Sequence, residues 1–196
     1  MNQKGFLLIV RGLPGSGKTT AIDRATTLSA SLRLDPDKVD TLSSEFVSFS
    51  EQCPKTLPVK KKIYRYLLRK ACVMLHMGKI VVWEQPWRSR DLFILTLENI
   101  AVIGYDIQSP DISALPFAVI IVEIYVSSEE ALTRVSERSI KGRHPLTPED
   151  FSQFNEPLEP FNNLGFPFAR FDGTQTPSEL ARDIETFIST HRKDVV

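Results

Sequence analysis

The feature that most restricts the fold of this chain is a glycine-rich segment near its start, Gly12–Thr19, which reads Gly-Leu-Pro-Gly-Ser-Gly-Lys-Thr. It matches the pattern Gly-x-x-x-x-Gly-Lys-[Ser/Thr], which binds phosphate groups when it connects a buried strand to a helix. An apolar run, 6–10, precedes the segment, and apolar residues at helical spacing follow it. The sequence therefore predicts a strand–loop–helix unit that holds the phosphates of a nucleoside triphosphate.

Each residue type in this segment has a physical reason. Glycines let the backbone curl around an oxyanion with its N–H groups pointing inward. The start of the following helix adds partial positive charge. We expect Lys18 to neutralise phosphate oxygens and the Thr19 hydroxyl to hold Mg²⁺. The residues expected to bind the nucleotide here are Gly12, Leu13, Pro14, Gly15, Ser16, Gly17, Lys18, Thr19 and Thr20.

The rest of the chain alternates apolar runs with amphipathic stretches, which is typical of a parallel α/β sheet. With the run at 6–10, five strands are predicted, the others at 31–34, 79–83, 117–126 and 166–171. Helices are predicted at 18–30, 59–77, 91–103, 128–139 and from 177 onward. Met77 is expected in the apolar stripe of the second helix, Gly104 is expected to end the third, and Thr176 with Glu179 to cap the last. We expect a single three-layer α/β domain over 1–196, with a basic helix at about 58–77 and a polar lid at about 139–163.

Composition limits the class of protein. Hydrophobic residues make up 42% of the chain and charged residues 24%, as in one globular domain. Lys+Arg and Asp+Glu both number 24, and this balance argues against a generic coat for nucleic acid or anionic membranes. The longest apolar run is interrupted by Glu123, so no membrane span is expected. The two cysteines are too few for a disulfide framework, and a cytoplasmic protein is expected.

Several classes of nucleotide-binding protein lack their signatures in this chain. The Asn-Lys-x-Asp and Asp-x-x-Gly segments of Ras-type GTPases do not occur, nor does the Leu-Ser-Gly-Gly segment of ABC-type ATPases. No apolar run ends in Asp-Glu, which disfavours motor proteins and AAA+ proteins. The third glycine of a dinucleotide fingerprint is also missing. A compact phosphotransferase remains.

Three segments resemble one known family. They are the glycine-rich segment, Asp35-Pro-Asp37-Lys-Val, and the basic pattern Arg134-x-x-x-Arg138 followed by Lys141-Gly-Arg143-His144. The chain is similar to the small P-loop kinases grouped with zeta-toxin and polynucleotide-kinase-like proteins, with AAA-type ATP binding and an adenylate-kinase-like fold. The resemblance implies a sheet of nucleotide-kinase type. It also implies that Asp37, or less directly Asp35, lies beside the acceptor hydroxyl, that Arg138 and Arg143 clamp the phosphates, and that Arg134 stacks on the base.

The positions of the acidic residues point the same way. Ligands of open α/β sheets bind at the carboxyl ends of the strands, and Asp35 and Asp37 follow the second predicted strand. A carboxylate there can orient an alcohol and accept its proton, although Asp37 also suits the cap of a helix. Glu84 ends the third strand, where it could hold Mg²⁺ through water. Arg88 and Arg90 could grip the acceptor or begin a solvated helix.

Basic residues dominate the predicted lid and one helix. Arg134 and Arg138 share a helix face, and a mobile lid can bring such cations to the transferred phosphoryl group. Lys61, Arg65 and Arg69 form a stripe that either attracts a phosphorylated acceptor or is simply solvated.

The expected function is transfer of the γ-phosphate of ATP, with Mg²⁺, to a hydroxyl of a small-molecule or nucleotidic acceptor. The expected catalytic residues are Lys18, Asp37, Arg138 and Arg143. Two alternatives remain, a polynucleotide 5′-hydroxyl kinase and a non-catalytic or toxin-type nucleotide-binding module. The acceptor, the preference for ATP over GTP and the oligomeric state are left open.

Overall fold

The computed structural model describes residues 4–108, 110–140, 151 and 158–192. Its centre is a five-stranded parallel sheet with the strand order β2-β3-β1-β4-β5. The strands are β1 (Phe6–Arg11), β2 (Leu32–Leu34), β3 (Ile80–Glu84), β4 (Ala118–Tyr125) and β5 (Phe168–Asp172). The prediction of an α/β fold around five parallel strands is therefore confirmed.

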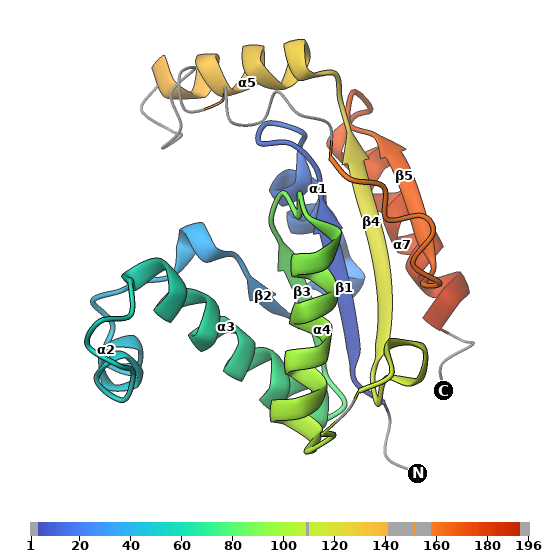
Figure 1. Ribbon diagram of the computed structural model, residues 1–196. Helices are drawn as coiled ribbons and strands as arrows, with labels where there is room; N and C mark the ends of the chain where they lie inside the picture. The colour runs from blue at the N-terminus through green and yellow to red at the C-terminus, as the bar shows by residue number, and fades with distance from the viewer. Residues whose placement is uncertain (1–3, 109, 141–150, 152–157, 193–196) are drawn as a thin grey trace.

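Helices cover both faces of the sheet (Figure 1). On one face lie α3 (Val59–His76) and α4 (Arg90–Tyr105), and on the other lie α1 (Lys18–Arg24) and α7 (Pro177–Arg192). Beyond the edge strand β2, α2 (Ser44–Glu51) packs against α3, while α5 (Ser128–Ile140) lies across the carboxyl ends of the strands. Short 3-10 turns are η1 (Thr26–Leu28), η2 (Pro36–Lys38) and η3 (Ile112–Ala114).

The core forms because the central strands are buried on both sides. All of β1 is buried, and its residues alternate between the two faces. Leu7 and Ile9 pack with α3 and α4, whereas Leu8 and Val10 pack with α1 and α7. Strands covered on both faces need apolar residues throughout, which explains the continuous apolar runs of the sequence.

Two helices differ from prediction because of tertiary contacts. The helix predicted over 18–30 ends at Arg24, and Ala25 is extended with ψ 101°. The Thr27 N–H and the Thr26 hydroxyl donate hydrogen bonds to Glu185 of α7, which replaces helical bonding at that point. Residues for which no element was predicted form α2, which has Phe46 as its buried residue and Ser43 as its cap.

The end of α4 and the exposure of Met77, which follows α3, also differ from prediction. Gly104 does not end α4, because the helix continues to Tyr105 and Asp106 takes the left-handed conformation with φ 55°. A Cβ on Gly104 would lie 3.1 Å from Cβ of Cys72, so this glycine permits close packing of α4 on α3. Met77 was predicted in the apolar stripe of α3 but is 60% exposed. Across the described part of the chain, no helix is long and apolar enough to cross a membrane.

Candidate functional site

The glycine-rich loop joins β1 to α1 at the carboxyl edge of the sheet. Gly12, Gly15 and Gly17 have φ values of 145°, 84° and 97°, which side chains rarely adopt. A Cβ on Gly12 would lie 2.3 Å from the Ile124 carbonyl oxygen, and one on Gly15 would lie 2.7 Å from the Ala131 carbonyl oxygen. The end of β4 and the helix α5 therefore enclose the loop so closely that only glycine fits at these two positions.

Lys18, the first residue of α1, lies across this loop. Its Nζ donates to the carbonyl oxygens of Gly12 at 2.8 Å and Leu13 at 2.9 Å. No side chain caps α1, so the first N–H groups of the helix point toward the loop without that partner. Thr19 is half-buried and Thr20 is exposed, while Leu13, Pro14 and Ser16 complete the loop. This arrangement can bind an anion through backbone N–H groups and one ammonium group.

Glu84 lies at the end of β3, next to the end of β1, where it pairs in register with Val10. Its Oε1 accepts hydrogen bonds from the guanidinium of Arg33 on β2, one of them 2.7 Å from Nε. Arg33 also donates to Asp23 of α1 at 2.6 Å. The Glu84 Oε2 is buried and has no hydrogen-bond partner in the described part of the chain. One carboxylate oxygen of Glu84 is thus available near α1, the helix that carries Thr19. Hard oxygen ligands of this kind suit Mg²⁺.

A buried ion pair supports the start of the loop from the other face. Arg11, which directly precedes Gly12, is fully buried with Nε 3.1 Å from Oε2 of Glu123 on β4. The Nε of Arg170 on β5 lies 2.6 Å from the other Glu123 oxygen, and the Arg11 guanidinium lies 3.8 Å from the ring centre of Phe161. Burial lowers the pKa of Arg11 to about 10, against the opposing effect of Glu123. Arg11 nevertheless stays charged at neutral pH.

The two aspartates after β2 have different environments. Asp35 caps η2, because its Oδ1 accepts the Asp37 N–H at 3.0 Å. Its Oδ2 lies 3.7 Å from Nζ of Lys38. Asp37 is exposed, and its carboxylate has no hydrogen bond or ion pair among the described residues. Capping is thus the role of Asp35, and Asp37 keeps its carboxylate available for other chemistry.

Arg88 and Arg90 flank the start of α4, and both are half-buried. Their backbones are bonded to Glu159, which lies within the predicted lid. The Arg90 N–H donates to the Glu159 carboxylate at 2.6 Å, and the Glu159 N–H donates to the Arg88 carbonyl oxygen at 3.3 Å. The loop before α4 is therefore joined to residues 158–163, where Phe161 is buried against Phe93.

Of the three arginines predicted in and before the lid, Arg134 is the one whose side chain the structure describes. Its Nε donates to Glu130 at 2.7 Å, and its Nη1 donates to the Gly173 carbonyl oxygen at 2.9 Å. It therefore connects α5 to the turn after β5, close to the loop that α5 covers. The side chain of Arg138, one helical turn later, lies outside the described residues, as do Arg143 and residues 141–150 and 152–157 of the predicted lid.

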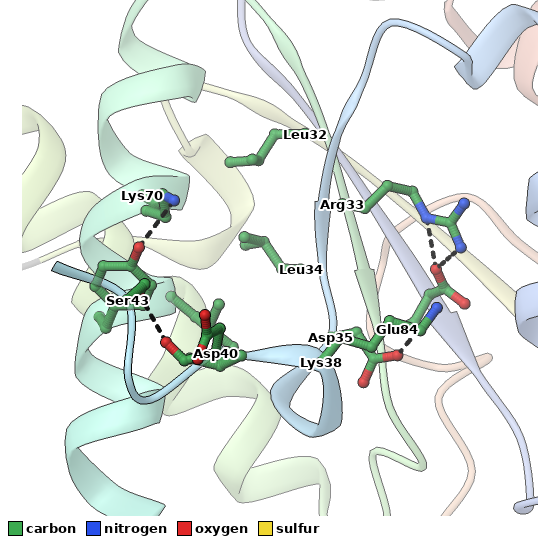
Figure 2. A pocket seen from close by; sticks show the side chains of 12 residues that line it. Leu32, Arg33, Leu34, Asp35, Lys38, Asp40, Ser43, Lys70 and Glu84 are labelled. Carbon is green, nitrogen blue, oxygen red and sulfur yellow. Dashed lines mark hydrogen bonds and ion pairs between the residues drawn. The ribbon is translucent and has the colours of Figure 1, made fainter. Parts of the chain in front are cut away.

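A cavity of about 370 Å³ lies between the edge strand β2 and α3 (Figure 2). Leu32 and Leu34 point from β2 toward α3, whereas Arg33 points to the opposite side, toward Glu84. The cavity is lined by apolar side chains from both elements and by polar groups that include Asp35, Lys38, Asp40, Ser43 and Lys70. Its volume falls within the range of small-molecule sites, and η2 borders it.

Sequence reasoning missed several residues around this edge. Arg33 is identified only in the structure, as the partner of Glu84. Gln85, directly after β3, accepts a hydrogen bond from the Tyr64 hydroxyl at 2.9 Å. One signal was available for Arg11, because it is a charged residue at the end of an otherwise apolar strand. No comparable signal existed for Tyr64, because tyrosines on amphipathic helices usually pack in the core.

The comparisons with known proteins identify the family of this chain. The family model described as an AAA domain matches residues 7–161, which include β1, the glycine-rich loop, Glu84 and α5. No match was found among curated proteins.

Solved structures share the fold over nearly the whole chain. A candidate kinase from Chloroflexus aurantiacus is 22% identical with a TM-score of 0.67, and 99% of each chain is covered. A gluconokinase from Sinorhizobium meliloti is 16% identical with a TM-score of 0.60, covering 98% of this chain and 96% of that one. An APS kinase from Mycobacterium tuberculosis is 12% identical with a TM-score of 0.58, covering 95% and 99%. At these identities the similarity establishes the fold that these kinases share.

Proposed function

Because this chain belongs to the AAA domain family, we propose that it is a P-loop kinase that transfers the γ-phosphoryl group of ATP to a hydroxyl of a small-molecule acceptor. One observation carries the proposal. The ends of three neighbouring strands, β1, β3 and β2, bear the glycine-rich loop, the Glu84 carboxylate and the free Asp37 carboxylate. These are groups that phosphoryl transfer requires for the phosphates, the metal and the acceptor.

The phosphates are held by the loop and by Lys18. The backbone N–H groups of the loop and the uncapped start of α1 bind the β- and γ-phosphate oxygens, and the Lys18 ammonium turns from the loop carbonyls toward them. Thr19 and Oε2 of Glu84, which has no hydrogen-bond partner among the described residues, would hold Mg²⁺. When bound, the metal ion neutralises charge on the phosphate oxygens. Arg134, Arg138 and Arg143 add positive charge from α5 and the segment after it.

Asp37 acts on the acceptor. Its exposed carboxylate orients the acceptor hydroxyl and takes up its proton as the oxygen attacks the γ-phosphorus. Arg88 and Arg90, from the loop after β3, are candidates for gripping the acceptor on its other side. The cavity beside η2 offers space for the body of a small molecule. The similar folds named as a gluconokinase, a deoxyadenosine kinase and an APS kinase support an acceptor of this size.

A second candidate function is that of a polynucleotide 5′-hydroxyl kinase. It is suggested by the sequence resemblance to polynucleotide-kinase-like proteins. It is supported by the exposed basic stripe Lys61, Arg65 and Arg69 on α3. The same residues can equally form a solvated face, so the small-molecule acceptor is preferred. The two functions differ in their response to salt.

The proposal is tested with labelled ATP, Mg²⁺ and pools of nucleosides, sugars, nucleotides and 5′-hydroxyl oligonucleotides. Lys18→Ala should lower transfer by about 100- to 1,000-fold, since it removes an electrostatic contact to the transferred group. Asp37→Asn should lower transfer by about 100-fold or more, as expected for loss of a general base. Lys79→Ala and Asp106→Asn, exposed residues at the opposite end of the sheet and of α4, are the matched controls.

Two results would count against the proposal. ATP binding without transfer to any pool would make the protein a nucleotide-binding module. Full transfer by Asp37→Asn would remove Asp37 as the base and leave the kinase assignment in place.

A further inference from the structure

Tyr64 of α3 and Gln85 form a polar pair at the carboxyl edge of the sheet. The Tyr64 hydroxyl donates to Oε1 of Gln85 at 2.9 Å. Gln85 directly follows β3, is only 7% exposed, and donates its backbone N–H to the Val10 carbonyl oxygen at 3.3 Å. The pair therefore lies beside the ends of β1 and β3. These are the strands that lead into the glycine-rich loop and that end at Glu84.

Asp37 lies on a turn next to the helix that carries Tyr64. This turn is η2, which packs against α3. Burial, and then the negative charge of Asp37, raise the pKa of Tyr64 above its ordinary value, so the phenol keeps its proton at neutral pH. Three elements thus bring together a phenol, a carboxamide and the carboxylate that is proposed to take the acceptor proton.

The loop that carries Gln85 is held rigidly. Trp87, two residues later, has φ 46°, which is rare for a bulky side chain. Its indole is 2% exposed and contacts the rings of Trp83 and Phe93, each with centroids 5.5 Å apart. Strained residues of this kind persist where the surrounding packing over-determines them, and they gather at functional sites. The amide of Gln85 therefore has a defined position before any ligand binds.

We propose that Tyr64 and Gln85 position the acceptor by hydrogen-bonding a second hydroxyl next to the one that faces Asp37, and that the acceptor is an uncharged polyol. This inference rests on the proposed kinase function. In the transfer, the acceptor oxygen forms a bond to the γ-phosphorus while the bond from that phosphorus to the bridging oxygen of ADP breaks. The acceptor proton passes to Asp37, and the second hydroxyl stays on the pair throughout.

The chemistry of the pair explains the choice of a neutral polyol. Phenol and carboxamide groups both donate and accept hydrogen bonds, which matches a hydroxyl, and neither carries charge at neutral pH. The charge of Asp37 on η2 acts on Tyr64, and a carboxylate so placed repels a phosphate or carboxylate on the acceptor at this position. A site built to hydrogen-bond a hydroxyl strongly rejects the analogue that lacks it, because its own buried polar groups are then left unpaired.

The test compares a polyol acceptor identified in the transfer assay with its deoxy analogue, which lacks the second hydroxyl, and with a phosphorylated analogue. The variants are Tyr64→Phe, Gln85→Met and the double variant. Tyr105→Phe is the matched control, since Tyr105 has a buried hydroxyl without a hydrogen-bond partner among the described residues, at the last residue of α4. Melting temperature and the KM for ATP are measured for every variant.

Wild-type protein should prefer the polyol over the deoxy analogue, and each variant should lose about 10-fold or more of that preference, mainly through KM for the polyol. The effects of the two substitutions should not add, since the side chains are hydrogen-bonded to each other. The KM for ATP should not change.

An equal loss of kcat/KM on both acceptors would show a merely structural role and overturn the inference, as would preference for the phosphorylated analogue. Unchanged selectivity in both variants would also overturn it while leaving the kinase function intact. Absence of transfer by wild-type protein to every pool would overturn the kinase function and this inference together.

Discussion

Gly12 and Gly17 share a backbone conformation that disfavours side chains, yet their surroundings differ. Both have positive φ, 145° and 97°. A Cβ on Gly12 would collide with the backbone of β4, whereas one on Gly17 meets nothing within 4 Å. At position 12 a side chain would both strain the backbone and clash with β4. At position 17 it would only strain the backbone.

We expect Gly12→Ala to destabilise the protein more than Gly17→Ala. For Gly17→Ala the cost is backbone strain of about 1–2 kcal/mol. Gly12→Ala adds displacement of the Ile124 carbonyl, which should move the loop and weaken ATP binding. Urea unfolding and ATP titration of both variants measure this, and equal losses of stability would show that the contact with β4 is unimportant.

At the scale of elements, Glu185 joins α7 to the segment that follows α1. Its carboxylate accepts the Thr27 N–H at 2.8 Å and the Thr26 hydroxyl at 3.1 Å. The Thr27 N–H, as the largest cause, lowers the pKa of Glu185 below its ordinary value of 4.5. This contact holds the end of the phosphate-binding helix against the opposite end of the chain, although the sequence predicted one longer helix there.

The contact makes a pH-dependent contribution to stability. Since the folded-state pKa of Glu185 is lowered, the contribution is present above pH 4.5 and disappears as the pH falls through the folded-state value. Glu185→Gln should cost about 1 kcal/mol at pH 7 and should cost less below pH 4.5. Urea unfolding across pH checks this, with Glu51→Gln, exposed at the end of α2, as control. A cost that does not vary with pH would contradict the expectation.

At the scale of the whole molecule, the zero net charge hides an uneven distribution. Basic residues gather in the first half of the sequence and acidic residues in the second. The structure accounts for part of the basic set, because Lys62 bonds Ser50 and Lys70 bonds Glu45. Both contacts attach α2 to α3. Lys61, Arg65 and Arg69 stay exposed on α3, so they are the part of the basic helix that a polyanion could reach.

Replacing Lys61, Arg65 and Arg69 together by alanine distinguishes the two proposed acceptors. With a small uncharged acceptor, turnover should stay within about two-fold, as for surface substitutions generally. A polynucleotide acceptor would instead bind less tightly, and its logarithmic salt dependence would become shallower by about 0.7 for each lost phosphate contact. Steady-state assays at several salt concentrations separate these results, and a shallower slope would favour the polynucleotide kinase.

Local patterns allowed much of the fold to be predicted. The apolar runs identified every strand of the sheet, and Thr176 with Glu179 correctly marked the start of α7, where they form a reciprocal capping pair. Errors arose where distant contacts decide local structure. The first predicted helix ended at Arg24, where Thr26 and Thr27 bond Glu185 of α7 instead of continuing the helix.

The sequence by itself determined the phosphate-binding loop and the parallel α/β class, because both depend on residue types at fixed short spacing. Only the tertiary structure decided which of the two aspartates caps η2, that Glu84 is held by Arg33, and that Tyr64 bonds Gln85. These contacts join segments far apart in the chain or depend on the geometry of one turn. Neither spacing nor composition encodes the contacts of Glu84 with Arg33 and of Gln85 with Tyr64, since these arise only when the ends of the strands come together at one edge of the sheet.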